Sequence, residues 1–303
     1  MSQENQFAVV TGASSGIGRA TARALATRGF HVLAGVRRES DAEQLIGENL
    51  EPVILDITDA AQIAALADRL AGDAEGRALR ALVNNAGIAV NAPVEAIPME
   101  EWRRQFEVNF FGQVALTQAL LPALLSARGR VINVSSIGGR VAGPTYGAYS
   151  ASKFALEAMS DVLRREVERF GVRVIVVEPG AVATPIWSKG IATAQELVAQ
   201  MRPEHQTRYG DLIAAALGRA QAASKDGIDP ADAARTIADA IDATKPRTRY
   251  LVGRDAKLMA RIAAILPDRA LDRLIARNLG LSEPGSADTR PGNRTPGSRS
   301  APG

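Results

Sequence analysis

Two side chains that could move a proton stand four residues apart in the stretch AYSASK. They are Tyr149 and Lys153, and a helix presents residues at this spacing on one face. A free tyrosine, with a pKa of about 10, is a poor acid or base near neutral pH. A neighbouring ammonium stabilises the phenolate and brings the pKa of the phenol toward the range of efficient acid–base catalysis. The pattern therefore predicts a proton donor with its tuning group, and a packing contact or a surface pair is the alternative.

A glycine-rich turn follows the first apolar run, in the stretch VVTGASSGIG. Gly12, Gly16 and Gly18 let a backbone approach a pyrophosphate closely, and the next helix offers free N–H groups and the positive end of its dipole. Ser14 and Ser15 add hydroxyl donors. A turn that needs glycine only for its positive φ is the alternative. The position between the first strand and the first helix favours dinucleotide binding.

The end of the second strand indicates which dinucleotide binds. An acidic residue at this place hydrogen-bonds the 2′-hydroxyl of NAD, but this chain has Val36 there, followed by Arg37. A guanidinium binds a 2′-phosphate with charge-assisted hydrogen bonds, so the sequence predicts NADP rather than NAD. The alternative is an exposed loop. Asp56, at the end of the third strand, could accept from the adenine amino group or cap the next helix, where Thr58 or Asp59 is better placed.

Further polar residues stand near strand ends or helix starts. Asn85 lies in NNAG, Ser136 ends NVSS, and Asn109 lies within a long helical pattern in VNFFG. Ligands of open α/β sheets bind at the carboxyl ends of the strands, where these residues and Tyr149 are expected to meet. Taken singly, each has a simpler explanation: a turn serine, a buried hydrogen-bonded amide or a surface tyrosine.

These residues must be positioned by strands that alternate with helices. The strand patterns are mostly apolar, which indicates burial on both faces of a parallel sheet flanked by helices. The repeated order predicts an α/β fold, a doubly wound Rossmann-type sheet of about seven strands. The expected strands cover residues 7–11, 31–36, 52–57, 80–86, 130–136, 173–179 and 249–253. The expected helices cover residues near 17–28, 39–47, 59–71, 100–126, 149–169 and 229–243.

The C-terminal part differs in composition from the rest. Residues 1–253 are predicted to form the dinucleotide-binding catalytic domain, and 254–281 an amphipathic helical extension that Pro267 breaks or kinks. This extension could pack on its own domain, contact another subunit or lie on a membrane surface. Residues 282–303 are rich in Gly, Pro, Ser and Arg and are expected to be disordered.

Composition excludes several classes of function. The chain has 303 residues, no cysteine and only two histidines, which excludes disulfides and ordinary zinc sites. Its net charge is +3 with both signs interspersed, so no nucleic-acid footprint is present. The N-terminus lacks a signal-peptide pattern, and no uncharged apolar stretch is expected to be long enough to span a bilayer. A cytoplasmic location is the expectation.

In these motifs the chain resembles the classical short-chain dehydrogenase/reductase family over residues 5–253. The stretches TGASSGIG, NNAG, YSASK and PGAVATP carry the resemblance together. It implies the sheet order 3-2-1-4-5-6-7 and a homo-oligomer, either dimer or tetramer. It implies a catalytic tetrad of Asn109, Ser136, Tyr149 and Lys153. The implied cofactor contacts are Gly12, Ser14, Ser15, Gly16, Ile17, Gly18, Arg37, Asp56, Ile57, Asn85, Tyr149, Lys153, Val182 and Thr184.

The same resemblance implies an oxidoreductase that interconverts a primary or secondary alcohol and the matching carbonyl with NADP(H), NAD being the second choice. Ser136 would polarise the substrate oxygen, and Asn109 would hold a water that links Lys153 to solvent. The chain looks like the hydroxysteroid- and retinol-dehydrogenase-like branch. Tyr146, Trp187 and neighbouring apolar residues predict an apolar or bulky small-molecule substrate. The alternative is that they only pack the lid after the sixth strand in its closed form. The rival hypotheses are a catalytically silent dinucleotide-binding regulator and an NAD-dependent alcohol dehydrogenase of the same family.

Overall fold

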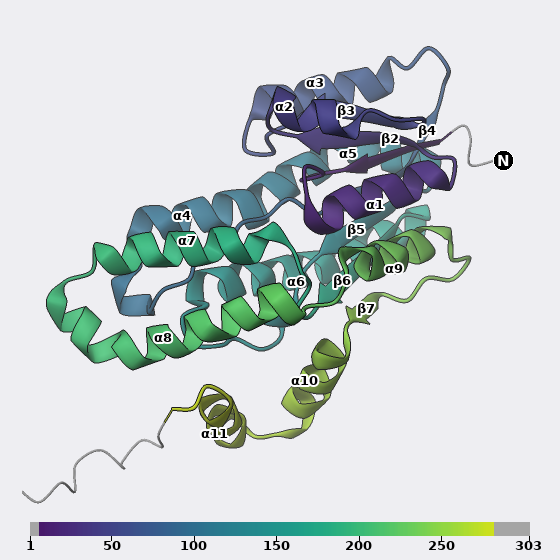
Figure 1. Cartoon of the computed structure of the whole chain (residues 1–303). Coiled ribbons are helices and arrows are strands. Elements are labelled where there is room, and N and C mark those ends of the chain that lie inside the picture. Colours follow the sequence, from purple (N-terminus) through teal and green to yellow (C-terminus); the bar gives the residue numbers. More distant parts are fainter. Residues whose placement is uncertain (1–5, 282–303) are drawn as a thin grey trace, which may run out of the picture.

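Seven strands form one parallel sheet in the computed structural model, which describes residues 6–281. Their order is β3-β2-β1-β4-β5-β6-β7, as the sequence predicts, and Figure 1 shows helices on both faces. The strands are β1 (Gln6–Val10), β2 (His31–Val36), β3 (Leu50–Ile54), β4 (Ala78–Asn84), β5 (Arg130–Val134), β6 (Arg173–Pro179) and β7 (Arg249–Val252).

Two hydrophobic cores, one on each face of the sheet, explain why the strands are apolar throughout. Along β1, Phe7 and Val9 belong to one core, whereas Ala8 and Val10 belong to the other. This alternation follows from the two-residue period of a strand. The helices of the described residues are α1 (Gly16–Thr27), α2 (Glu39–Ala42), α3 (Ala60–Ala71), α4 (Met99–Phe106), α5 (Gly112–Ala127), α6 (Gly147–Val167), α7 (Pro185–Ala199), α8 (Pro203–Asp226), α9 (Pro230–Asp242), α10 (Arg254–Ile265) and α11 (Asp268–Asn278).

The helices divide between the two cores according to their apolar faces. α1 and α9 pack together on one face of the sheet, and α3 and α5 cover the other. A third, smaller core lies under α7 and α8, where Leu197 and Ile213 pack against Val90 and Ala148. In Figure 1, α7 and α8 extend as a pair beyond the sheet.

One long helix consists of three segments, of which the middle one is π-helical. α4 continues through a π-helical segment, Glu107–Phe111, into α5. By length and composition the helix Met99–Ala127 could cross a membrane, contrary to the expectation from the sequence, because an 18-residue window within it has a mean hydropathy of 1.4. The inner face of this helix nevertheless packs on the sheet, where Leu116, Leu120 and Leu124 are buried. These contacts are those of a core helix.

Two predicted elements are shorter in the structure. β3 ends at Ile54 rather than at residue 57, so Asp56 lies in the loop beyond the strand. The helix expected near 39–47 shortens to α2 and a single 3₁₀ turn, Glu43–Leu45. As predicted, Pro267 separates α10 from α11, because it cannot continue a helix from the preceding turn. The domain boundaries at 253 and 281 stay predictions, and the expected disorder of 282–303 lies outside the described residues.

Candidate active site

The glycine turn between β1 and α1 has the geometry of a cradle for phosphate. Gly12 and Gly16 adopt φ of 63° and 54°, where a side chain would be strained. A Cβ on Gly18 would collide with the carbonyl oxygen of Gly12 and the side-chain amide of Asn85. Ser15 forms no side-chain cap on α1, so the first N–H groups of this helix are left for a ligand.

Two residues hold this turn in place: Thr11, which follows β1, and Asn85, which follows the neighbouring strand β4. The Nδ2 of Asn85 donates to the carbonyl oxygens of Thr11 at 2.9 Å and of Gly12 at 3.3 Å. The hydroxyl of Thr11 accepts from the backbone of Asn85 and Ala86 at 2.9 and 3.0 Å. Across the cleft, a Cβ on Gly16 would lie 2.9 Å from the methyl group of Thr184. The predicted cofactor residues on three different loops are thus packed around one turn.

The adenosine end of the site contains Arg37 and Asp56. Arg37 follows β2 and is exposed, whereas Val36 is buried in the core. Asp56 accepts from the backbone and the hydroxyl of Thr58 at 2.9 and 2.7 Å with one oxygen. Asp59 caps α3, as the sequence favours. Asp56 is therefore not needed as a helix cap, and its role toward a nucleotide stays a prediction.

Tyr149, Lys153 and Ser136 meet where β5 ends and α6 begins. The amine of Lys153 donates to the carbonyl oxygen of Val134 at 2.8 Å and lies 6.0 Å from the centre of the Tyr149 ring. The hydroxyl of Ser136 accepts from the backbone of Gly138 at 3.0 Å. A side-chain hydrogen bond joins Ser136 to Tyr149. The serine thus lies in contact with the hydroxyl that it is predicted to assist.

The electrostatics of the pair differ from the sequence expectation. Removal from bulk water raises the pKa of Tyr149, and the hydrogen bond with Ser136 opposes this rise only in part. Burial also lowers the pKa of Lys153 to about 8, against the attraction of Glu157. The net pKa of Tyr149 is therefore raised rather than lowered, because burial outweighs the groups that favour the phenolate, and the amine of Lys153 is bonded to Val134.

Asn109 lies in the π-helical segment and is buried. Its Oδ1 accepts from the backbone of Ile88 at 2.8 Å, and its Nδ2 donates to the carbonyl oxygen of Ile88 at 3.0 Å and to Ser152 at 3.3 Å. The amide therefore fixes the loop after β4 against α6. The extra residue of a π turn is a feature often found at functional sites. The water-binding role of Asn109 stays a prediction.

A single cavity of about 650 Å³ unites these residues. Gly18 alone of the predicted residues does not line it, because this glycine packs behind the turn. The predicted residues in its wall are Gly12, Ser14, Ser15, Gly16, Ile17, Arg37, Asp56, Ile57, Asn85, Asn109, Ser136, Tyr149, Lys153, Val182 and Thr184. A volume of this size, with a phosphate cradle at one end and ionisable groups at the other, fits a dinucleotide and a small substrate.

A buried cluster of ion pairs lies behind α6, and the sequence did not predict it. Arg140 donates to Glu178 at 2.6 Å, and Arg249 donates to Glu157 at 3.1 Å. The Nε of Arg249 also lies 3.5 Å from Glu178. Burial and the nearby Glu157 raise the pKa of Glu178 to about 7, although Arg140 and Arg249 oppose the rise. The one sequence signal was the spacing of Glu157, one helical turn after Lys153.

This cluster makes the stability of the fold depend on pH. The pKa of Glu178 rises from an ordinary 4.5 to about 7 in the folded chain. The stability that Glu178 contributes is therefore fully present below pH 4.5 and is lost as pH rises through 7. The free energy of unfolding falls by about 3 kcal/mol, at 1.36 kcal/mol per pKa unit. Urea denaturation between pH 4 and 8 should show this loss, and Glu178→Gln should flatten the profile. Glu166→Gln, at an exposed position on α6, should leave the slope unchanged. An unaltered slope in Glu178→Gln would refute the assignment.

The parallel sheet, the phosphate cradle and the tyrosine–lysine–serine group define a Rossmann-type dinucleotide-binding oxidoreductase. The chain belongs to the short-chain dehydrogenase family, whose model matches residues 6–195.

Two relatives and one solved structure illustrate the likeness. The chain is 36% identical to an NADPH-dependent 3-dehydrocapnine reductase of Ornithobacterium rhinotracheale, over 90% of this chain and 97% of that protein. It is 39% identical to retinol dehydrogenase 5 of Homo sapiens, over 89% and 88%. A crystal structure of a short-chain dehydrogenase from Burkholderia cenocepacia in complex with NADP matches with a TM-score of 0.69 and 31% identity, over 92% and 99%.

Proposed function

We propose that this oxidoreductase uses NADP(H) in preference to NAD(H) to interconvert an apolar or bulky carbonyl compound and its alcohol. The observation that carries the proposal is the shared cavity, in which Tyr149, Ser136 and Lys153 face the same space as the glycine turn. A bound nicotinamide dinucleotide supplies or accepts the hydride. Residues of this chain must then bind the substrate, polarise its oxygen and move one proton.

In the direction of reduction, the hydroxyl of Tyr149 gives its proton to the carbonyl oxygen. Ser136, hydrogen-bonded to Tyr149, is placed to donate to the same oxygen and to stabilise the charge that develops on it. The ammonium of Lys153 stabilises the phenolate that remains. Oxidation reverses these steps, with the phenolate as the base. Asn109 holds the loop at Ile88 against α6 and so preserves the spacing.

The preference for NADP rests on Arg37. This exposed guanidinium lines the cavity at the end of β2, where buried Val36 offers no carboxylate to a ribose hydroxyl. The NADPH-dependent relative and the NADP complex of a related dehydrogenase agree with this choice. The substrate class is supported by apolar side chains in the same wall, among them Val141, Ile186 and Trp187.

Arg37→Ala tests the cofactor choice. A hydrogen-bonded charge pair contributes about 1.5–3 kcal/mol, so kcat/KM with NADPH should fall by about 10- to 100-fold. With NADH it should change little. Arg38→Ala is the matched control, because Arg38 is the adjacent exposed arginine and does not line the cavity. Initial rates with both nucleotides, using a panel of ketones and aldehydes and absorbance at the reduced nicotinamide band, give the answer. A parent enzyme that prefers NADH would refute the proposal.

A further inference from the structure

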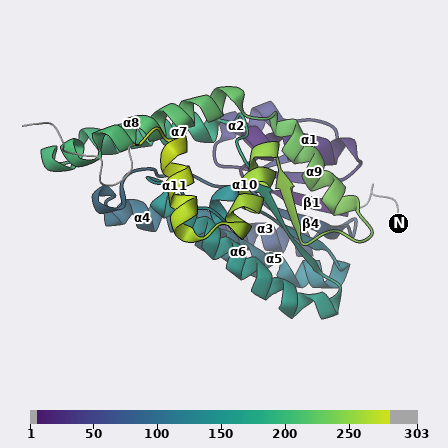
Figure 2. The ribbon, with the colours of Figure 1, turned by 90° about the horizontal axis from the view of Figure 1, so that it is seen from below.

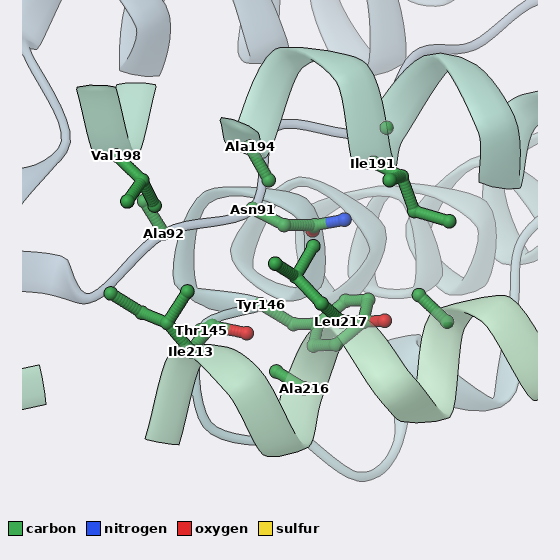
Figure 3. A pocket seen from close by; sticks show the side chains of 12 residues that line it. Asn91, Ala92, Thr145, Tyr146, Ile191, Ala194, Val198, Ile213, Ala216 and Leu217 are labelled. Carbon is green, nitrogen blue, oxygen red and sulfur yellow. The ribbon is translucent and has the colours of Figure 1, made fainter. Parts of the chain in front are cut away.

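The substrate end of the cavity extends past Tyr149 to a second tyrosine. The ring of Tyr146 lies edge-on to that of Tyr149, with 6.4 Å between ring centres. Tyr146 also borders a smaller cavity of about 20 Å³, which Figure 3 shows between α7 and α8. Burial raises the pKa of Tyr146 to about 12, so its hydroxyl is neutral at physiological pH. Tyr146 therefore forms an uncharged wall between the reacting centre and α8.

One face of α8 continues this wall and carries a positively charged side chain, Arg219. Ala216, Arg219 and Ala223 all line the main cavity, and their spacing of three and four residues puts them on the same side of the helix. Arg219 is exposed and forms no ion pair with any residue between 6 and 281. Its charge nevertheless reaches Tyr146, where it opposes the larger effect of burial on the pKa of the phenol. The guanidinium thus lines the same cavity as the wall tyrosine and forms no hydrogen bond with another described residue.

The part of the wall formed by the C-terminal helices is mostly apolar, with Asn278 and Asp255 as its polar members. Met259 of α10, Ile275 of α11 and Leu279 just beyond it line the same cavity. Figure 2 shows α11 crossing below the gap between α8 and α6. A ligand reaching from Tyr149 to Arg219 would therefore pass between alanines, a neutral phenol and these aliphatic side chains.

Among residues 6–281, no carboxylate of the cavity wall forms an ion pair with Arg219. Among the described residues in the cavity wall, the acidic ones are Asp56 and Asp255. Asp56 lies at the adenosine end and is bonded to Thr58. Asp255 accepts from the backbone of Ala181 at 2.7 Å, beside the loop after β6. A guanidinium without an ion-pair partner among the described residues is suited to an anionic group on the ligand.

We propose that the substrate is an amphipathic carbonyl compound or alcohol with a carboxylate-type anionic group, and that Arg219 binds this group. The proposal rests on the oxidoreductase function above and names the class of its substrate. The reacting carbon would lie at Tyr149 and the apolar body between Tyr146, Met259 and Ile275. The anion would form the fork-like pair that arginine makes with carboxylates.

The test compares oxo acids of graded chain length with their methyl esters, using NADPH as reductant. At the chain length that spans the cavity, the parent enzyme should prefer the acid by at least about tenfold in kcat/KM, the discrimination that a charge-assisted pair supplies. Arg219→Gln should abolish this preference by raising KM for the acid, and Arg219→Lys should restore part of it. Lys225→Gln is the control, because it removes one positive charge from an exposed site on α8 outside the cavity wall.

The outcomes separate this proposal from the one on which it rests. Equal kcat/KM for acid and ester at every chain length in the parent would overturn the role of Arg219 and leave the oxidoreductase function standing. A rise in KM for NADPH in Arg219→Gln, with the acid preference intact, would assign Arg219 to the nucleotide instead. A parent enzyme that binds NADPH but turns over neither acids, esters nor the apolar panel would overturn both proposals.

Discussion

Tyr149→Phe should lower kcat/KM by at least about 10²- to 10⁴-fold, the range that a positioned acid–base group supplies. Phenylalanine keeps the ring that packs edge-on against Tyr146 and removes only the hydroxyl that is joined to Ser136. The dinucleotide cradle lies on other loops, so the Kd for NADPH should change by no more than a few-fold. The expected result is a variant that binds the nucleotide and fails at proton transfer.

Tyr146→Phe is the sharpest comparison for this variant. It removes the same atom from a tyrosine three residues earlier in the same cavity wall. Tyr146 has a serine, Ser150, at the offset where Tyr149 has Lys153. The loss of kcat in Tyr146→Phe should therefore be far smaller. Nucleotide binding by fluorescence and single-turnover kinetics distinguish the two effects, and substantial turnover by Tyr149→Phe would remove the tyrosine from its assigned role.

The arrangement of the site could be predicted because sheet topology is a strong constraint. Asn85, Ser136 and Val182 each follow a different strand, and parallel strands place all their carboxyl ends at one edge. The mostly apolar strand runs predicted burial on both faces, which the two cores confirm. Local rules also worked where the signal was local, as with Asp229, whose side chain caps α9 ahead of Pro230.

What could not be predicted depends on burial and on contacts between distant residues. The pKa shifts of Tyr149 and Lys153 follow from desolvation, which no spacing of residues reveals. Arg249 and Glu157 are 92 residues apart, so their ion pair required the packed structure. The π-helical segment around Asn109 has no composition that distinguishes it from an ordinary helix. Arg219 likewise reads as one more exposed helix charge until the cavity is seen.

Lys153→Met should have opposite effects on activity and on stability. The lysine is 4% exposed, and burial lowers its pKa from 10.5 to about 8. Between these two pH values the unfolded chain binds more protons than the folded one, so stability rises with pH. Below pH 8 the fold carries the whole cost of the buried ammonium, about 3 kcal/mol at 1.36 kcal/mol per unit. Methionine fills a similar volume without the charge.

The variant should accordingly be more stable than the parent at pH 7, by about 1–3 kcal/mol once the lost hydrogen bond to Val134 is subtracted. The stability difference should shrink as pH rises from 8 to 10.5. Its kcat/KM should fall by about 10²-fold or more, since the phenolate of Tyr149 loses the only cation near its ring among the described residues. Urea denaturation at pH 7 and 10 and steady-state rates at pH 7 measure both effects.

A gain in stability together with a loss of activity would mean that the buried charge of Lys153 destabilises the fold and is needed for the reaction. A structural lysine would behave otherwise, because its removal would lower stability and reduce activity only in proportion to the unfolded fraction. If Lys153→Met is less stable than the parent at pH 7, the penalty assigned to the buried amine is wrong and the bond to Val134 dominates. Buried cations are costly, and here the cost falls on the residue that the reaction needs.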